Sequence, residues 1–214
     1  MSRNQYVSGA VIRRLPRYYR FLGELLDKNI TRISSKELAE LMSLTASQIR
    51  QDLNCFGGFG QQGYGYNVEY LYHEIAKILG IDRQNSMIII GGGHFGQTLA
   101  NYDNFEKRGF VTKAIFDVSP KRIGKTVRGI MTYDMSELET WLLENPVKIA
   151  VLTIPKQVAQ EVADRLVACG VKAIWNFAHL DLKLPSDVVV ENVHLSESLM
   201  QLSYRIAAKE DKKR

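Results

Sequence analysis

The 214-residue sequence predicts an α/β protein of two parts, a small helical domain followed by a doubly wound parallel sheet. Residues 85–195 alternate short apolar runs with amphipathic segments, the order in which parallel strands and their crossover helices occur. Residues 1–84 contain helix signals followed by a glycine-rich hairpin, and a short polar stretch at 79–85 joins the two halves. Residues 196–214 add a further helix and the charged tail "KEDKKR".

Five runs in the second half predict strands, namely "SMIIIG", "VTKAIFD", "VKIAVLT", "VKAIWNF" and "DVVVENV". Their apolar residues follow one another without alternating with polar ones, as in strands that helices cover on both faces. The intervening segments 95–109 and 155–170 are amphipathic and predict helices. The second half is therefore predicted to be a Rossmann-type domain.

A glycine-rich turn lies between the first of these strands and the following helix. Gly91, Gly93 and Gly96 have GxGxxG spacing, with Gly92 as an extra glycine. In a dinucleotide-binding turn the first glycine permits the tight turn, the second lets the backbone approach a pyrophosphate, and the third allows close helix–strand packing. Glycine turns also serve as plain strand–helix connectors, so the evidence here is the spacing together with the strand and helix around it.

An acid ends the next predicted strand. Asp117 lies 21 positions after Gly96, where a carboxylate that binds the ribose diol is expected. Its negative charge repels a 2′-phosphate, which favours NAD over NADP. Lys121 and Arg122 follow closely and favour the opposite preference. The sequence therefore predicts an NAD(H) site and leaves the strength of the preference open.

Segment 34–54 contains two helix starts in close succession. Ser34 with Glu37, and Thr45 with Gln48, have the spacing of capping boxes. The two helices are expected to turn apolar side chains inward: Leu38, Leu41 and Met42 from the first, and Ala46, Ile49 and Leu53 from the second. The outward face of the second helix carries side chains suited to base edges and phosphates: Ser47, Arg50, Gln51 and Asn54.

The surrounding segments complete a winged helix-turn-helix pattern. The segment "FGGFGQQGYGYNV" places five glycines among aromatic residues and predicts a hairpin wing. Upstream, "RRLPRYYRFLGELL" predicts a helix that begins at Pro16, since proline is tolerated at the first helical position. Apolar residues are spaced there to cover a core: Val11, Leu15, Tyr18, Leu22 and Leu25. Arg13, Arg14 and Arg17 remain for phosphates. A small helical dimerisation module is the alternative to DNA binding.

Composition and charge narrow the class of protein. With 45% hydrophobic and 24% charged residues the chain is typical of globular proteins, and its apolar runs are too short to span a bilayer. The first ten residues lack the apolar core of a signal peptide, so the expected location is cytoplasmic. Cys55 and Cys169 lie far apart and are expected to be reduced. The charged residues before the first acid, Glu24, are all basic: Arg3, Arg13, Arg14, Arg17 and Arg20. Such a run suits either contact with a phosphate backbone or a solvated helix face.

Catalytic residues are poorly represented. A hydride-transfer enzyme needs a proton donor or acceptor beside the nicotinamide, yet the sequence has no Tyr-xxx-Lys pair. His179 follows a predicted strand and is the best catalytic candidate, but it has no Asp or Arg partner in the sequence. No His, Cys, Asp or Glu cluster has metal-ligand spacing. We therefore expect no catalytic residue and no metal site.

Taken together, these segments resemble the Rex family of redox-sensing transcriptional repressors over essentially the whole chain. The motifs that carry the resemblance are "RRLPRYYRFL", "TASQIRQDLNCFGGFGQQGYGYNV", "GGGHFG", "AIFDVSP", "LTIP" and "WNFA". The resemblance implies a homodimer with N-terminal winged-helix domains, C-terminal Rossmann domains and a domain-swapped C-terminal helix. It also implies that NADH and NAD+ compete for the Rossmann site and that NADH releases the protein from double-stranded operator DNA with an inverted repeat.

The residues and the resemblance together assign two sets of contacts. The cofactor contacts are Gly91, Gly92, Gly93, His94, Phe95, Gly96, Asp117, Val118, Lys121, Thr153, Ile154, Pro155, Asn176, Phe177 and Tyr204. The DNA contacts are Arg14, Arg17, Thr45, Ser47, Gln48, Arg50, Gln51, Asn54, Phe59, Gly60, Gln62, Gly63 and Tyr64. By the resemblance, Asn176 and Phe177 lie near the nicotinamide, and Tyr204 matches an aromatic aimed at the partner's nicotinamide pocket.

The predicted C-terminal helix is apolar on two sides. One stripe consists of Leu195, Leu199, Leu202 and Ile206, and the other of Met200, Tyr204 and Ala207. Such a helix fits between two bodies, or else deep within its own domain. The chain departs from the family pattern at Gln61-Gln62 in the wing, at His179 and at His194, where an arginine, a proline and an acid are usual.

The sequence thus predicts a cytoplasmic, dimeric, NADH-responsive DNA-binding repressor that is not an enzyme. An NAD-dependent oxidoreductase with an accessory N-terminal domain is the alternative. A Rossmann-type module that associates with protein partners is a third possibility.

Overall fold

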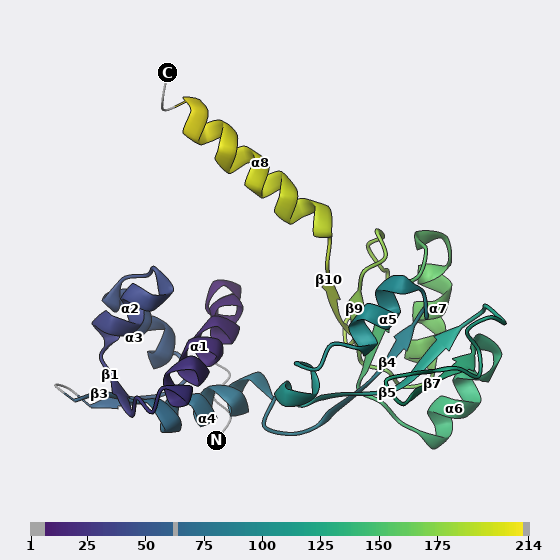
Figure 1. Cartoon of the computed structure of the whole chain (residues 1–214), viewed down its shortest axis with the longest axis horizontal. Coiled ribbons are helices and arrows are strands. Elements are labelled where there is room, and N and C mark those ends of the chain that lie inside the picture. Colours follow the sequence, from purple (N-terminus) through teal and green to yellow (C-terminus); the bar gives the residue numbers. More distant parts are fainter. Residues whose placement is uncertain (1–6, 62–63, 212–214) are drawn as a thin grey trace. The chain divides into compact units, whose positions relative to one another are not determined.

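The computed structural model describes residues 7–61 and 64–211 (Figure 1). The chain divides into two compact units, Met1–Arg83 and Gln84–Arg214. Helices dominate the first unit, and a seven-stranded sheet forms the centre of the second. The fold class predicted from the sequence is confirmed.

The first unit consists of helices and a small antiparallel sheet. Its helices are α1 (Gly9–Asp27), α2 (Ser35–Met42), α3 (Ala46–Asn54) and α4 (Val68–Leu79). Its strands are β1 (Arg32–Ile33), β2 (Gly60–Gln61) and β3 (Gly65–Asn67), in the order β1-β3-β2. The five apolar residues expected to cover a core from α1 are all buried. Helices α2 and α3 form the helix-turn-helix, and β2 and β3 form the wing.

Helix caps explain where α2 and α3 begin. Ser34 Oγ accepts a hydrogen bond from the Glu37 amide at 3.1 Å, and Glu37 Oε2 accepts one from the Ser34 amide at 2.8 Å. This reciprocal pair is the predicted capping box. Thr45 Oγ1 likewise accepts from the Gln48 amide at 3.1 Å, but the Gln48 side chain donates to Asp52 and does not reach back. The second capping box is therefore only half formed.

Two expectations for the first unit were wrong. Helix α1 begins at Gly9, and Pro16 lies inside it with an exposed ring. The helix continues through the proline because its apolar stripe is buried from Val11 onward, and this packing outweighs the lost backbone hydrogen bond. Leu41 is 46% exposed, and Ala39 is buried in its place, since the short α2 presents only a narrow face to the core.

The second unit is built on a mainly parallel sheet in the order β10-β9-β8-β4-β5-β7-β6. The five predicted strands are confirmed as β4 (Asn85–Ile90), β5 (Phe110–Asp117), β8 (Ile149–Leu152), β9 (Ala173–Asn176) and β10 (Val189–Asn192), and they pair in parallel. Sequence analysis missed β6 (Thr126–Val127) and β7 (Ile130–Asp134); β6 pairs antiparallel with β7. Strand order reverses between β4 and β8, so the carboxyl ends of the strands open a crevice there.

Helices cover both faces of this sheet. They are α5 (His94–Ala100), α6 (Leu138–Glu144) and α7 (Lys156–Ala168), with 3-10 turns η1 (Glu106–Arg108) and η2 (Met135–Glu137). The predicted helix at 95–109 is thus replaced by α5 and the short turn η1. Phe116 and Leu152 pack with residues of α6 and α7, whereas Ile89 and Ile115 pack with Ala100 of α5.

The last helix, α8 (Leu195–Asp211), contains no buried residue within that range. Six large apolar side chains, drawn from both predicted stripes, are more than half exposed: Leu195, Leu199, Met200, Leu202, Tyr204 and Ile206. Such an exposed apolar surface is typical of a contact site for another protein surface. In the described part of the chain, no helix combines the length and the apolar character needed to cross a membrane.

Candidate dinucleotide and nucleic-acid sites

A cavity of about 580 Å³ lies at the carboxyl ends of β4, β5 and β8. Seven of the predicted cofactor residues line it: Gly91, Gly93, Asp117, Val118, Thr153, Ile154 and Pro155. Sequence reasoning did not assign the other lining residues, which include Arg122, Met135, Val158 and Val162. The position matches the rule that ligands of open α/β sheets bind where the strand order reverses.

The three fingerprint glycines have different local surroundings. Gly91 has a φ of +101°, and a Cβ there would lie 2.8 Å from the Thr153 carbonyl oxygen. A Cβ on Gly96 would collide with the Gly91 carbonyl oxygen. Gly93, by contrast, has no heavy atom within 4 Å of its Cβ position, so a ligand can approach the backbone there. These are the turn, packing and approach roles predicted for the motif.

Thr153, which directly follows the neighbouring strand β8, stabilises this turn. Its Oγ1 lies 2.8 Å from the Gly91 carbonyl oxygen and 3.0 Å from that of Ile90. The hydroxyl therefore holds the end of β4 against the end of β8 while it lines the cavity.

Asp117 is only 5% exposed, and its carboxylate faces the glycine turn. Oδ2 accepts a hydrogen bond from the Gly92 amide at 2.6 Å, and Oδ1 accepts one from the Ser119 amide at 2.7 Å. Arg122 Nη1 lies 3.1 Å from Oδ2 and 3.2 Å from Oδ1. Lys121 is exposed and does not line the cavity, so Arg122 is the basic residue of this site.

Several apolar side chains line the cavity, among them Phe116, Met135, Ile154 and Val162. Arg165 also lines it, and it pairs with Glu139 at 2.6 Å and donates to the Met135 carbonyl at 2.9 Å. An apolar wall suits a flat heterocycle, and a nearby carboxylate suits a diol. The cavity therefore has the features expected of a site for an adenosine.

Asn176 is fully buried, and its side-chain amide forms hydrogen bonds with other residues of the same domain. Nδ2 donates to the Leu180 carbonyl and to Asn192 Oδ1, each at 2.8 Å, and Oδ1 accepts from the Ala178 amide at 3.0 Å. These bonds tie the loop after β9 to β10. Asn176 thus positions the loop that begins at Phe177, and its amide NH₂ has no remaining donor for a nicotinamide.

Aromatic contacts surround this loop. Phe177 packs edge-on against Phe95 with ring centroids 4.9 Å apart, and against Trp175 at 4.6 Å. Phe95 is 38% exposed and His94 is also exposed at the start of α5. Phe95 and Phe177 thus form a contiguous aromatic surface beside the glycine turn.

Two of the departures from the family pattern lie in contact. The Nδ1 atoms of His179 and His194 are 3.3 Å apart, and their rings are stacked with centroids at 5.5 Å. Neither histidine lines the cavity, so His179 is not placed for catalysis there. Within residues 7–61 and 64–211, no group of three or more His, Cys, Asp or Glu side chains is placed to hold a metal ion. Cys55 and Cys169 are both free thiols.

The first unit presents the outward face of α3 to solvent. Ser47, Arg50, Gln51 and Asn54 are exposed, as predicted, whereas Ile49 and Leu53 are buried. Arg50 Nη1 donates to Ser35 Oγ at 3.1 Å, which links the middle of α3 to the start of α2. Thr45, also exposed, caps α3. This face has the composition of a helix that reads base edges in a major groove.

Beneath that face lies a buried acid that sequence reasoning missed. Asp52 is fully buried and pairs with Arg14 through two bonds, Nε to Oδ2 at 2.6 Å and Nη2 to Oδ1 at 2.7 Å. The Tyr18 hydroxyl donates to Oδ2 at 2.9 Å, and Gln48 Nε2 donates to Oδ1 at 2.8 Å. Burial raises the pKa of Asp52, but the hydrogen bonds from Arg14, Gln48 and Tyr18 outweigh it and hold the pKa below its usual value.

This network changes the interpretation of two predicted DNA contacts. Arg14 already has Asp52 as a partner and fixes α3 against α1, whereas Gln48 bonds to Asp52 within α3 itself. Arg17 donates to the Met42 carbonyl through Nη2 at 2.6 Å and is otherwise exposed. Arg13 is exposed beside them on α1. No sequence signal marked Asp52, because its partners Arg14 and Tyr18 lie on another helix, 38 and 34 residues away.

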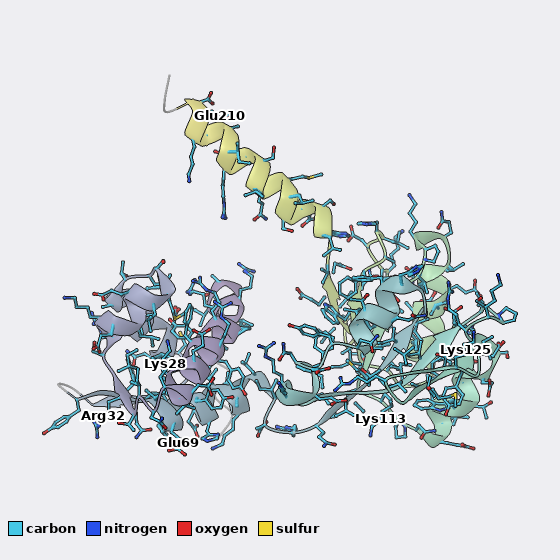
Figure 2. The ribbon with its side chains drawn as sticks, viewed as in Figure 1. Lys28, Arg32, Glu69, Lys113, Lys125 and Glu210 are labelled. Atoms are coloured by element: carbon cyan, nitrogen blue, oxygen red, sulfur yellow. The ribbon has the colours of Figure 1, made fainter. Side chains whose placement is uncertain are left out.

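The wing is held by aromatic packing and by an arginine that was not predicted. Phe59 packs edge-on with Tyr70 at 6.3 Å, and a Cβ on Gly60 would lie 2.8 Å from the Tyr66 ring. Tyr64 is 69% exposed, and the Arg32 guanidinium lies 5.9 Å from its ring centroid, with Nη1 donating to its carbonyl at 3.3 Å. Figure 2 labels Arg32 beside this sheet. The predicted contacts Gln62 and Gly63 lie outside the described residues.

A helix-turn-helix with an antiparallel wing, joined to a parallel sheet with a dinucleotide-type cavity, defines the class: a transcription regulator with a Rossmann-type ligand domain. Residues 6–54 match the family model "Putative DNA-binding protein N-terminus", and residues 82–180 match "CoA binding domain". Relatives and solved structures then identify the family. The chain belongs to the Rex family of redox-sensing transcriptional repressors.

The similarity extends over nearly the whole chain. The redox-sensing transcriptional repressor Rex of Caldanaerobacter subterraneus subsp. tengcongensis is 58% identical over 210 residues, which cover 98% of this chain and 94% of the relative. That of Clostridioides difficile is 57% identical over 201 residues, covering 94% and 96%. The crystal structure of RSP in complex with beta-NAD+ and operator DNA has a TM-score of 0.92 and 56% identity, covering 98% of this chain and 97% of that one.

A second solved structure, RSP in complex with beta-NADH, has a TM-score of 0.90 and 53% identity, covering 98% and 99% of the two chains. The relatives are named as transcriptional repressors, and the comparisons favour a repressor over the oxidoreductase alternative.

Proposed function

We propose that this chain represses transcription as a homodimer on operator DNA and leaves the DNA when NADH occupies its Rossmann cavity. The observation that carries the proposal is the combination, in one chain, of an open approach at Gly93 and a buried Asp117 in one cavity with an exposed polar face on α3. The solved relatives with beta-NAD+ and operator DNA, and with beta-NADH, support the same pairing of ligands.

The cavity residues fit a dinucleotide. The backbone at Gly93 is open to a pyrophosphate, and the apolar wall that includes Phe116 suits the adenine. Asp117 has the charge to bind the ribose diol. When bound, the nicotinamide supplies the redox signal, because its reduced ring is neutral and its oxidised ring is cationic. Phe177 and the partner's Tyr204 would enclose the neutral ring.

The first unit supplies the DNA contacts. Arg50, Gln51 and Asn54 on the outward face of α3 would meet base edges, and Arg13 and Arg17 on α1 would meet phosphates. Two such units in a homodimer require an inverted repeat. A repressor of bacterial-type operators works beside the chromosome, so its location is cytoplasmic.

We assign three segments to these tasks: 1–84 to DNA, 85–195 to the cofactor, and 196–214 to the partner subunit. The last assignment is supported by α8, on which Leu199, Met200 and Tyr204 are exposed on different sides of one helix. Exchange of α8 between subunits would bury both stripes and connect each cavity with the opposite DNA-binding domain.

The experiment that tests this function is a titration of NADH with and without operator DNA. NADH shifts the protein off DNA only if it prefers one arrangement of the dimer. By reciprocity, operator DNA must weaken NADH binding by the factor by which NADH weakens DNA binding. A Tyr204→Ala variant is expected to bind NADH nearly as well and to respond to it less on DNA. Identical NADH curves with and without operator would show that the two sites are uncoupled.

A further inference from the structure

The Asp117 carboxylate can accept only a limited number of hydrogen bonds, which restricts how a ligand can bind to it. A carboxylate offers about four lone-pair positions. The amides of Gly92 and Ser119 occupy one position on each oxygen, at 2.6 and 2.7 Å. The remaining position on each oxygen faces Arg122 Nη1, which lies 3.1 and 3.2 Å away. A ribose diol therefore has to take the positions that Arg122 holds.

The exposure of the Arg122 side chain allows its guanidinium to move away from those positions. Its side chain is 41% exposed, whereas that of Asp117 is 5% exposed. Its backbone is fixed by a turn, in which the Arg122 amide donates to the Ser119 carbonyl at 2.9 Å. An exposed guanidinium on a fixed backbone can exchange one partner for another at little cost. Arg122 and Asp117 both line the cavity.

The chemistry that fits a released guanidinium at a ribose 2′ position is a phosphate. Arginine binds phosphate oxygens through a planar fork of donors. In the native site the Asp117 charge both neutralises Arg122 and repels such a phosphate. We propose that Arg122 is a latent receptor for the 2′-phosphate of NADP(H), which Asp117 masks, so that the pair and not Asp117 alone determines cofactor selectivity. This inference rests on the proposed binding of NAD(H) in the cavity.

Neighbouring basic residues offer a matched control. Lys125 is exposed on the same segment, does not line the cavity and makes only backbone contacts with Arg122 and Thr132 among the hydrogen bonds described (Figure 2). If general positive charge attracted the 2′-phosphate, removal of Lys125 would matter as much as removal of Arg122. If the guanidinium geometry matters, only Arg122 will have an effect.

The test measures binding of NADH, NADPH and adenosine 2′,5′-bisphosphate to the full-length protein by titration calorimetry. Asp117→Ser is expected to strengthen NADPH and bisphosphate binding by about tenfold or more, because a charged hydrogen-bonding partner is unmasked. Adding Arg122→Gln should abolish that gain, whereas adding Lys125→Ala should leave it. Arg122→Gln alone should leave NADPH excluded, because the Asp117 charge that repels the 2′-phosphate remains.

The outcomes separate this inference from the proposed function. If the unmodified protein binds no NADH, the function proposed above fails. If it binds NADH but the NADPH gain is absent from Asp117→Ser, or persists after Arg122→Gln is added, the masked-receptor inference is overturned. Should Asp117→Ser unfold, Asp117→Asn replaces it, because the amide oxygen still accepts one of the two backbone hydrogen bonds and the charge is removed.

Discussion

Asp52 in the first unit and Asp117 in the second are the two buried acids among the described residues, and an arginine pairs with each. Asp52 accepts four hydrogen bonds, and each comes from a side chain of its own unit. Asp117 accepts two backbone hydrogen bonds on one side and faces an exposed guanidinium and a cavity on the other.

The difference shows what makes a buried carboxylate structural or ligand-facing. At Asp52 about four lone-pair positions meet four donors, so no position remains for a ligand and the group fixes α3 against α1. At Asp117 the backbone fixes the carboxylate, and the only side-chain partner is replaceable. Both carboxylates are buried and paired with an arginine. They differ in their remaining hydrogen-bond donors, which are side chains at Asp52 and backbone amides at Asp117.

The largest expected effect is on folding of the first unit. Asp52→Ala leaves Arg14 without its partner and should lower the free energy of unfolding by about 3–5 kcal/mol, the usual cost of breaking a buried ion pair. Operator binding should fall with it, because α3 loses its anchor. Urea unfolding measures the loss, with Glu40→Ala, at an exposed acid on α2, as the control. An unchanged unfolding midpoint would show that the Asp52 network is not structural.

Acid should weaken the first unit through the same group. The pKa of Asp52 is lower in the folded protein than its ordinary value of 3.8, so its contribution to stability is present above about pH 4 and is lost as the pH falls through the lower folded value. Wild-type stability should therefore decline more steeply below about pH 4 than that of Asp52→Asn. Urea unfolding at a series of acidic pH values checks this, and parallel pH profiles would contradict it.

Asp117→Asn should affect NADH binding more than it affects stability. Stability should fall less than for Asp52→Ala, because the amide oxygen still accepts one backbone hydrogen bond. NADH affinity should fall by about tenfold or more, since charged hydrogen bonds to the ribose diol are lost. Calorimetric titration and urea unfolding of the same preparation measure both quantities. A large stability loss with unchanged NADH affinity would erase the proposed distinction between the two acids.

The smallest effect is expected at Arg32, an arginine with no acidic partner among the bonds described. Its guanidinium lies over the Tyr64 ring and donates to the Tyr64 carbonyl. Arg32→Ala should weaken binding to all DNA sequences alike and reduce the salt dependence of binding by about one phosphate contact per subunit. Gln51→Ala should instead relax the preference at one base position. Fluorescence anisotropy at several salt concentrations separates the two, and an unchanged salt slope for Arg32→Ala would exclude a phosphate contact.

Local signals in the sequence were enough for much of the fold. Ser34 and Glu37 are three residues apart, and the capping box they form depends on nothing beyond that turn. The five predicted strands were recovered because continuous apolar runs can be buried only between two layers. Gly91 and Gly96 have the turn and packing surroundings expected from the motif: Gly91 has a positive φ, and Gly96 has no room for a Cβ beside the Gly91 carbonyl oxygen.

Side-chain partners across long separations were not predictable in this way. Arg14 and Asp52 are 38 residues apart, and nothing in either segment indicates the other. The resemblance places Asn176 near the nicotinamide, but it gives no indication that the Asn176 amide bonds to Leu180, Ala178 and Asn192. Strand β6 was missed because two residues are too few to show a pattern.

The sequence by itself determined the order of helices and strands, the caps, the glycine turn and the acid at the end of β5, because each follows from backbone preferences and from neighbours within a few residues. The tertiary structure alone decided that Arg122 and not Lys121 faces Asp117, that Pro16 lies within α1, and that Asp52 binds Arg14. Those outcomes depend on which elements pack together, since hydrogen-bond donors find a buried carboxylate by proximity in space and not by spacing along the chain.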